Sequence, residues 1–307
     1  MIAALALLYK LMPLYIMVAL GWVAGRYLDA TGRNIAGIMM YIILPAVVFY
    51  GVMSAPLSAE VVLLPFLVLG LCSVLGVLHL IIAKRWVGDE SADLIPLAVG
   101  TGNTGYFGIP LALLIFGEQG LAMYIVCMLG TTLYESSVGF YLAARGRYGV
   151  RDCMRKVSRL PSLYAFFLAV MLNFAGFEIP DVFLPLFENI RGAYIVFGMM
   201  IIGMSILSFH GLAGNLRFTG LAFAGKFISW PLAALTFWWL DSQWLHIYDV
   251  AVHQAILLIS ITPIAANTVV IATLLDTAPK QVAGTALLST VFALVYIPLM
   301  VSLVFGF

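Results

Sequence analysis

Long apolar runs, separated by short polar connections, make up almost the whole chain. A membrane-spanning helix needs roughly 20 mostly apolar residues, and most of the runs have about this length. They predict about ten spanning helices, over residues 5–27, 34–53, 60–83, 94–116, 119–143, 161–176, 186–208, 218–240, 250–275 and 281–305. No connection exceeds about 17 residues, which leaves no room for a soluble domain. We therefore expect an all-α integral membrane protein that lies in a lipid bilayer.

The amino-acid composition is typical of a membrane protein. Of the 307 residues, 64% are hydrophobic and 9% are charged, whereas about 25% are charged in an average soluble domain. The net charge of +1 gives no reason to expect a nucleic acid as partner. The three cysteines (Cys72, Cys127 and Cys153) have neither the spacing of metal ligands nor an even count. We expect reduced cysteines, no metal site and no cofactor.

The basic residues gather on one side of the predicted membrane. Connections on the side of the first one hold twelve of the fifteen Lys and Arg residues, namely Arg26, Arg33, Lys84, Arg85, Arg145, Arg147, Arg151, Arg155, Lys156, Arg159, Arg217 and Lys280. The opposite connections are acidic, apart from Arg191. Lys and Arg are enriched in cytoplasmic connections, so the basic side is predicted to be cytoplasmic. We expect a multi-pass protein of the cell membrane, such as a bacterial inner membrane, with both termini outside.

Two apolar segments are interrupted where a membrane helix should be continuous. Residues 100–110 contain four glycines, an Asn-Thr pair and Pro110, and residues 260–268 contain Pro263 and a second Asn-Thr pair. Proline removes a backbone donor and disfavours helix at the residue before it. An irregular backbone at membrane depth is tolerated only where it is buried in protein or lines a wet cavity. The two breaks therefore indicate a site near the membrane midplane, although a pair of simple proline kinks is the alternative.

The chain is predicted to contain two copies of a five-helix unit. The longest and most basic connection, 145–160, separates residues 1–144 from residues 161–307. Similar short sequences occur on both sides of this division, such as PLY at 13–15 and PSLY at 161–164. Because five is odd, the second copy would enter the membrane from the opposite face, which makes the repeat inverted. The interrupted helices are the fourth and the ninth, so each is the fourth of its unit, as in inverted-repeat transporters.

The two breaks favour an anion as ligand. We expect new half-helices to begin near Pro110 and near Asn267, because Pro suits the first helical position and Asn is a favoured N-cap. Each helix N-terminus presents unpaired N–H groups and the positive end of a helix dipole. Side-chain amides and hydroxyls can add hydrogen bonds to a carboxylate. The predicted substrate-binding residues are Asn103, Thr104, Gly105, Pro110, Pro263, Asn267 and Thr268.

Two ionisable residues lie well inside predicted spans. Glu135 is in the fifth span among several hydroxyl residues, and Lys226 is in the eighth. Such residues are costly in lipid and are functional candidates by default. Glu135 is a candidate for carrying a coupling proton or ligating a cation, with a structural polar contact as the alternative. Lys226 is a candidate for pairing with Glu135 or attracting the substrate, with snorkelling to the interface as the alternative.

The interrupted segments resemble those of the auxin efflux carrier family. The matching stretches are NTGYFGIPL at residues 103–111 and TPIAANTVV at residues 262–270. The family includes plant auxin exporters and bacterial carriers of the malate and malonate type. The resemblance implies that the fourth and ninth helices cross beside the substrate. It also implies a scaffold of helices one, two, six and seven, a moving transport domain built from the rest, and a homodimer formed through the scaffold.

The predicted layout extends this resemblance over nearly the whole chain and indicates a function. The long central cytoplasmic loop of many plant auxin carriers is absent, which favours the short bacterial type. We expect a secondary transporter of a small organic anion, such as a mono- or dicarboxylate, that works by alternating access. A sodium-coupled symporter of the bile acid type, which shares the general fold, is the alternative, so coupling to H+ or Na+ stays open.

Two other classes of protein are weighed against a transporter. An intramembrane enzyme usually needs a nucleophile–base pair or a metal constellation, and the predicted spans contain neither paired carboxylates nor clustered histidines. We therefore do not expect an enzyme. A sensor of the same fold would bind the ligand without moving it.

Overall fold

The structure, a computed structural model, describes residues 2–28, 30–144, 148–207 and 215–305. Within these ranges the chain forms helices and connecting segments only. Six helices are long and apolar enough to cross a membrane, and up to eight if each of two bent helix pairs forms one span. The expectation of an all-helical, multi-pass membrane protein is confirmed. The count of ten spans stays a prediction.

The first half of the chain runs through four long helical segments. These are α1 (Ile2–Tyr27); α2 (Gly32–Ile38), η1 (Met39–Ile43) and α3 (Leu44–Met53) in direct succession; α4 (Ala59–Trp86); and a segment built from η2 (Glu90–Leu94), α5 (Ile95–Gly100), η3 (Thr104–Gly108), α6 (Ile109–Tyr134), η4 (Glu135–Gly139) and α7 (Phe140–Ala143). The elements η1, η3 and η4 are π-helical turns. Such turns are rare and often occur at functional sites.

A sharp bend divides the last of these segments. Gly117 has φ 67° and ψ −163°, so two helices meet at this residue inside α6. A straight helix of the 54 residues from Glu90 to Ala143 would be about 81 Å long, whereas the hydrocarbon core is about 30 Å thick. A positive φ of this kind is readily adopted by glycine alone. Gly117 therefore lets the chain reverse between two membrane-sized helices.

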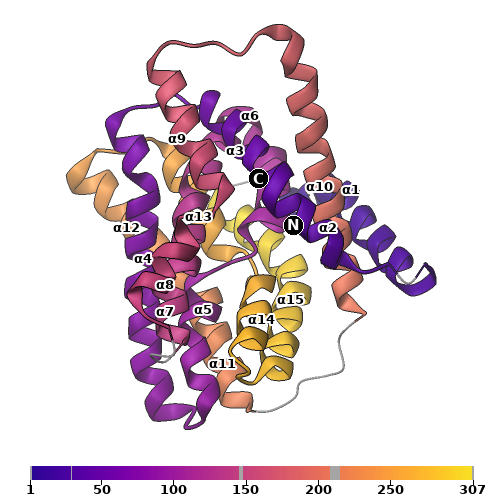
Figure 1. Ribbon diagram of the computed structural model, residues 1–307, viewed down its shortest axis with the longest axis vertical. Helices are drawn as coiled ribbons and strands as arrows, with labels where there is room; N and C mark the ends of the chain where they lie inside the picture. Colours follow the sequence, from indigo (N-terminus) through magenta and orange to yellow (C-terminus); the bar gives the residue numbers. More distant parts are fainter. Residues whose placement is uncertain (1, 29, 145–147, 208–214, 306–307) are drawn as a thin grey trace.

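The second half contains a comparable series of helices. They are α8 (Val150–Val157), α9 (Pro161–Phe174), η5 (Asp181–Phe183), α10 (Leu184–Ile206), α11 (Leu216–Ala224), η6 (Gly225–Ser229), α12 (Trp230–Leu240), η7 (Asp241–Leu245), α13 (Val250–Ile261), α14 (Ala266–Leu274) and α15 (Pro279–Phe305). The α8 helix lies in the predicted basic loop 145–160, of which residues 145–147 are outside the described part of the chain. Figure 1 shows α14 and α15 side by side, which agrees with their contacts.

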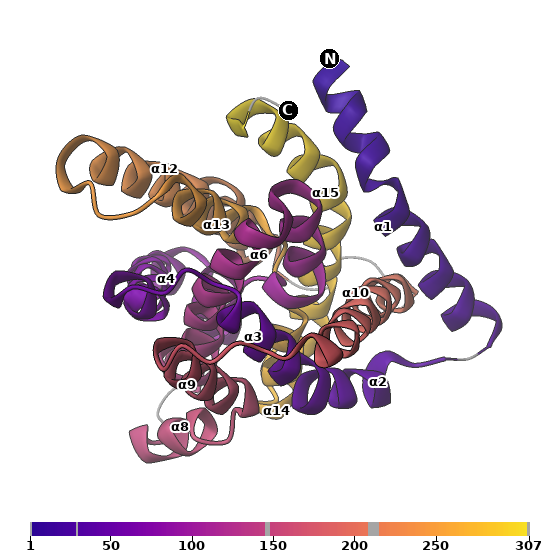
Figure 2. The same cartoon turned by 90° about the horizontal axis from the view of Figure 1, so that it is seen from above.

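The helices pack in two groups. In the first group α1 packs against α10, and α3 packs against α9. In the second, α4 packs against α5 and α6, and α13 packs against α6 and α12. Figure 2 shows α1 at the edge of the molecule, with α12 and α13 together on the other side. The first group consists of the helices that the resemblance implies for a scaffold, and the division into a scaffold and a transport domain stays a prediction.

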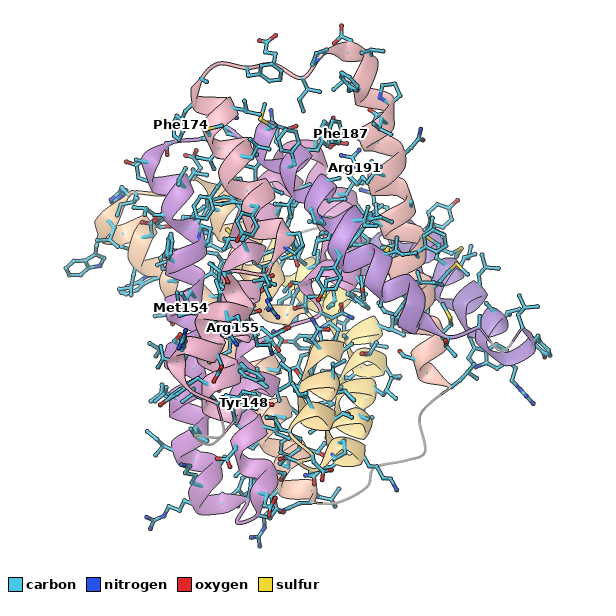
Figure 3. The ribbon with its side chains drawn as sticks, viewed as in Figure 1. Tyr148, Met154, Arg155, Phe174, Phe187 and Arg191 are labelled. Atoms are coloured by element: carbon cyan, nitrogen blue, oxygen red, sulfur yellow. The ribbon has the colours of Figure 1, made fainter. Side chains whose placement is uncertain are left out.

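Small residues allow the closest contacts within the first group. A Cβ on Gly21 of α1 would collide with the backbone of Met200, and a Cβ on Gly203 of α10 would collide with the backbone of Val18. Close backbone approach at glycines is a common basis of helix association in membranes. Further along α10, Phe187 stacks on Tyr50 with 5.2 Å between ring centroids. Figure 3 shows Phe187 near Arg191, whose guanidinium pairs with Glu118.

Candidate functional site

The two interrupted helices meet at their breaks. The first break lies at residues 101–103, between α5 and η3, and the second at residues 262–265, between α13 and α14. The backbone N–H of Asn103 donates a hydrogen bond of 2.8 Å to the carbonyl oxygen of Pro263. The α13 and α14 helices are bent by 53° at their break. Each break therefore satisfies part of the backbone that the other exposes, as membrane depth requires.

The restart of the first helix differs from the sequence-based expectation. Helical structure resumes at Thr104 rather than near Pro110, because the carbonyl oxygen of Asn103 accepts hydrogen bonds from both Phe107 and Gly108, each at 3.2 Å. This wide π-helical turn ends directly before Ile109. It accommodates Pro110 within the first turn of α6, where a missing N–H is least costly.

The second restart lies close to the predicted position, although the predicted cap is wrong. The α14 helix begins at Ala266, with Ala265 as its N-cap. Asn267 is therefore the second residue of the helix, and its side chain is free to point away from the helix end. Asn267 is thus not the cap of α14, and its predicted role as a substrate-binding residue stays a prediction.

A cavity of about 90 Å³ lies where the two breaks meet. Four of the seven predicted substrate-binding residues line this cavity, and they are Asn103, Thr104, Gly105 and Asn267. Glu135 lines it as well. A water takes about 30 Å³ in the liquid, so the cavity has room for about three waters. A small ligand fits the same space.

The cavity wall has a polar and an apolar part. Residues 102–106 and 265–267 bring the first turns of two helices to the wall, and such turns carry unpaired N–H groups and a positive dipole end. The hydroxyls of Thr131 and Thr132 lie on the same wall. The apolar part consists of Met40, Leu44, Tyr106, Met128 and Tyr194. This arrangement suits an anionic group attached to a short carbon chain.

The remaining three predicted residues support the breaks from outside the cavity. Pro110 is buried in the first turn of α6. Pro263 is also buried, and its carbonyl oxygen accepts the hydrogen bond from the backbone N–H of Asn103. Thr268 is fully buried, and its hydroxyl lies 3.4 Å from the hydroxyl of Thr101. These residues shape the crossing of the two segments and do not line the cavity.

Glu135 and Asn267 form a direct contact across the cavity. The side-chain amide nitrogen of Asn267 donates to Oε1 of Glu135 at 2.9 Å. The cation that interacts electrostatically with Glu135 is Lys156 on α8. Its ammonium lies 3.5 Å from the centroid of the Phe140 ring. A predicted loop residue therefore supplies a charge beside the cavity.

Lys226 is buried at the crossing, so the interpretation as a snorkelling residue is wrong. Its side chain is 1% exposed, and Nζ donates to the carbonyl oxygen of Ile259 at 3.4 Å. A Cβ built on Gly102 would lie 2.8 Å from this Nζ, which puts the ammonium directly behind the first break. Within the described part of the chain, Lys226 forms no ion pair with Glu135. The suggested pairing of the two charges is therefore not found.

Several residues of the site carry no clear sequence signal. Tyr194 reaches the cavity from α10, and a Cβ on Gly105 would lie 2.5 Å from its hydroxyl. Thr131 belongs to the hydroxyl-rich stretch around Glu135, and its hydroxyl lies 3.2 Å from that of Thr104. The glycine pattern of residues 100–108 is the one signal that could have indicated close contacts by large side chains.

The structure gives no candidate for a metal site among the residues it describes. No group of three or more His, Cys, Asp and Glu side chains in those ranges has the geometry to hold a metal ion. The cavity instead contains amides, hydroxyls, one carboxylate and two helix ends.

Comparisons with known proteins agree with this architecture. Residues 6–152 match the model of a family described as membrane transport protein. An uncharacterized transporter of Methanocaldococcus jannaschii is 28% identical over 296 residues, which cover 92% of this chain and 94% of the relative. An uncharacterized transporter of Methanothermobacter thermautotrophicus is 30% identical over 173 residues, which cover 52% of this chain and 55% of the relative. The first half of the chain is therefore similar to this membrane transport protein family, and the predicted resemblance to a family of membrane transporters is confirmed.

Proposed function

We propose that the protein is a secondary transporter of a small organic anion, most simply a mono- or dicarboxylate, that binds at the meeting point of the two breaks. The observation that carries this proposal is the convergence of two helix N-termini on one small cavity. Two such termini attract an anion without needing a basic side chain in the wall. The cargo is therefore negative.

The side chains of the wall support a carboxylate in particular. The amides of Asn103 and Asn267 and the hydroxyl of Thr104 can donate hydrogen bonds to carboxylate oxygens. The hydroxyls of Thr131 and Thr132 donate to the carbonyl oxygen of Met128 and would rotate to join them. The aromatic and methionine side chains opposite them would hold the carbon chain. The small volume of the cavity, about 90 Å³, favours short mono- and dicarboxylates over larger anions.

Lys226 also favours an anionic substrate, from its position behind the first break. Its ammonium is buried next to Gly102, which itself lines the cavity. A positive charge in surroundings of low dielectric acts strongly over short distances. We infer that Lys226 raises the affinity for the anion without direct contact.

The packing of the helices supports an inverted repeat of five plus five spans. In that repeat α1 corresponds to α9, and the helix ending in α3 corresponds to α10. Exchanging the two units converts the α1–α10 contact into the α9–α3 contact, and both of these contacts occur. In the proposed cycle the group containing both breaks moves against the group of α1, α3, α9 and α10. The basic side faces the cytoplasm and both termini lie outside.

Transport assays on purified protein in proteoliposomes test the proposal. Uptake of radiolabelled acetate, lactate, malonate, malate and succinate would be compared in vesicles with and without the protein. We expect saturable uptake of at least one of these carboxylates, and its loss in Asn103→Ala and in Asn267→Ala. Asn189→Ala is the matched control, because Asn189 is exposed on α10 and away from the cavity.

Two outcomes would change the assignment. Normal uptake in both cavity variants would refute the proposed site, and no uptake or binding of any carboxylate would refute the proposed cargo. The coupling ion is tested by replacing sodium with choline in the same vesicles. Uptake that stops in choline would favour the sodium-coupled alternative.

A further inference from the structure

Glu135 is the only carboxylate among the described residues that line the cavity. It lies on η4 and is partly exposed toward the cavity. Its Oε1 accepts the hydrogen bond of 2.9 Å from the amide of Asn267, the second residue of α14. A carboxylate of the protein itself therefore lies at the helix N-terminus that would bind the carboxylate of a substrate.

We propose that Glu135 is a tethered competitor of the substrate, and that binding of one carboxylate substrate displaces Glu135 from Asn267 and loads one proton onto Glu135. This inference rests on the proposed function, since it requires a carboxylate cargo. It adds the coupling ion: one proton would travel with each substrate molecule. Glu135 is then the residue that couples proton transport to substrate transport.

Charge repulsion within a small space supplies the physical reason. An ionised substrate and an ionised Glu135 would share a cavity of about 90 Å³. Two carboxylates in one such site do not both stay ionised, because each disfavours the charged form of the other. A protonated Glu135 instead presents an O–H donor to the substrate. The proton is taken from the bulk solution through the open cavity and forms an O–H bond on one oxygen of Glu135, so the solution loses one proton for each substrate bound.

Other titratable groups lie on the elements packed around Glu135. Tyr106 from η3 and Tyr194 from α10 share the cavity wall. Tyr134 of α6 donates its hydroxyl to the carbonyl of Pro96. From α4, Cys72 is buried and His79 contacts the carbonyl of Leu75 and the hydroxyl of Ser229.

The α8 helix supplies the charged neighbour of Glu135. Lys156 interacts electrostatically with Glu135, and Cys153 of the same helix interacts with Lys156. No ion pair within 4.0 Å joins Lys156 and Glu135, and the ammonium lies on the ring of Phe140. The competing possibility is clear from this geometry: a displaced Glu135 could stay ionised by moving to Lys156, and no proton would then be taken up.

Binding measurements at several pH values separate the two cases. The probe is the best-bound carboxylate from the transport panel, titrated calorimetrically between about pH 7 and about pH 9, where such carboxylates are themselves ionised. With one linked proton, we expect the Kd to rise up to about tenfold per pH unit. In weakly buffered solution, about one proton should be taken up per molecule bound.

Glu135→Gln is the informative variant, and Glu188→Gln is its control. Glutamine keeps an oxygen that can accept from Asn267 but cannot take up a proton, so its Kd should not change with pH and no proton should be taken up. Glu188 is exposed on α10, and its variant should behave as the wild type. In proteoliposomes, an inward proton gradient should raise uptake by the wild type and leave uptake by Glu135→Gln unchanged.

The outcomes distinguish this inference from the proposed function. Wild-type binding without proton uptake and with a constant Kd overturns the inference while the proposed function stands, and this result does not depend on whether any variant folds. Proton uptake that persists in Glu135→Gln also overturns it, because another group is then the carrier. Absence of any carboxylate binding by the wild type overturns the proposed function instead.

Discussion

Glu135 and Lys226 lie on opposite sides of the same crossing but in very different surroundings. Both lie on π-helical turns, η4 and η6, within otherwise regular helices of different halves of the chain. Glu135 is open to the cavity and bonded to a side chain, whereas Lys226 is sealed by protein and bonded to a carbonyl oxygen. The same local structure, a π-helical turn, therefore holds two different kinds of charge. We expect Glu135 to exchange hydrogen-bond partners and Lys226 to stay in place.

The difference predicts different roles for the two charges in one transport cycle. An exchangeable carboxylate can follow the arrival and departure of the substrate. A sealed ammonium cannot, so we expect it to contribute a positive potential that does not change during the cycle. Buried charges without an ion partner are costly, and we expect this cost to be offset by a higher affinity for an anion.

Replacing Lys226 should produce the largest effect on substrate affinity. Lys226→Met keeps the length and the apolar part of the side chain but removes the charge. The loss of one nearby charge in a low-dielectric site costs about 2 kcal/mol, which corresponds to about 30-fold weaker carboxylate binding. The affinity is measured calorimetrically at one pH.

A thermal unfolding measurement on the same variant separates charge from folding. The apparent Tm of Lys226→Met should stay level or rise, because a buried charge is replaced by an apolar side chain. Lys84→Met, at an exposed position near the end of α4, is the control and should change neither quantity. Unchanged affinity in Lys226→Met would mean that the fixed charge does not act on the site.

The contrast also explains which features of the site are predictable from the sequence. Pro110, Pro263 and the glycines mark the breaks because their effect on the backbone is local. Glu135 and Lys226 are recognisable as intramembrane charges for the same reason. Their partners are not, since Asn267 meets Glu135 across 132 positions in the chain and Ile259 meets Lys226 across 33.

Tertiary packing decides the features that the sequence left open. The helix restarts at Thr104 because the carbonyl oxygen of Asn103 accepts two hydrogen bonds. The sequence does not show this, because Pro110 favours a helix start six residues later. Lys156 was counted with the basic loop, and its place beside Glu135 depends on α8 packing against η4. Tyr194 reaches the cavity because Gly105 leaves space for its hydroxyl. None of these contacts follows from the order of residues in one segment.

Gly102 offers a way to disturb the fixed charge while keeping it. In Gly102→Ala the new Cβ would lie 2.8 Å from Nζ of Lys226 and would also collide with the hydroxyl of Thr262. Such overpacking costs about 1–3 kcal/mol of folding stability and moves the ammonium away from the break. Losing part of the electrostatic attraction of the ammonium, about 1.4 kcal/mol, makes carboxylate binding roughly tenfold weaker. Calorimetric titration of the purified variant measures this loss.

A double variant shows which contact is responsible. If the alanine acts by displacing the ammonium, then adding Gly102→Ala to Lys226→Met should cost much less than tenfold, because the two changes share one interaction and methionine repacks easily. A full tenfold loss in the Lys226→Met background would assign the effect to Thr262 instead.

The smallest predicted effect concerns a hydroxyl on the open side of the crossing. Thr131 lines the cavity, and its hydroxyl donates to the carbonyl oxygen of Met128 at 2.8 Å and lies 3.2 Å from the hydroxyl of Thr104. Thr131→Val keeps the shape but removes one hydrogen-bonding group, which is worth about 1 kcal/mol, so carboxylate binding should weaken about fivefold.

Thr236→Val is the control, because the Thr236 hydroxyl is exposed and bonded to the carbonyl of Leu232. A change that is equal in both variants would mean that the Thr131 hydroxyl is not a ligand. A fivefold loss confined to Thr131→Val, beside a pH dependence as steep as that of the wild type, would show that the open side binds the anion through neutral donors while Glu135 alone carries the proton.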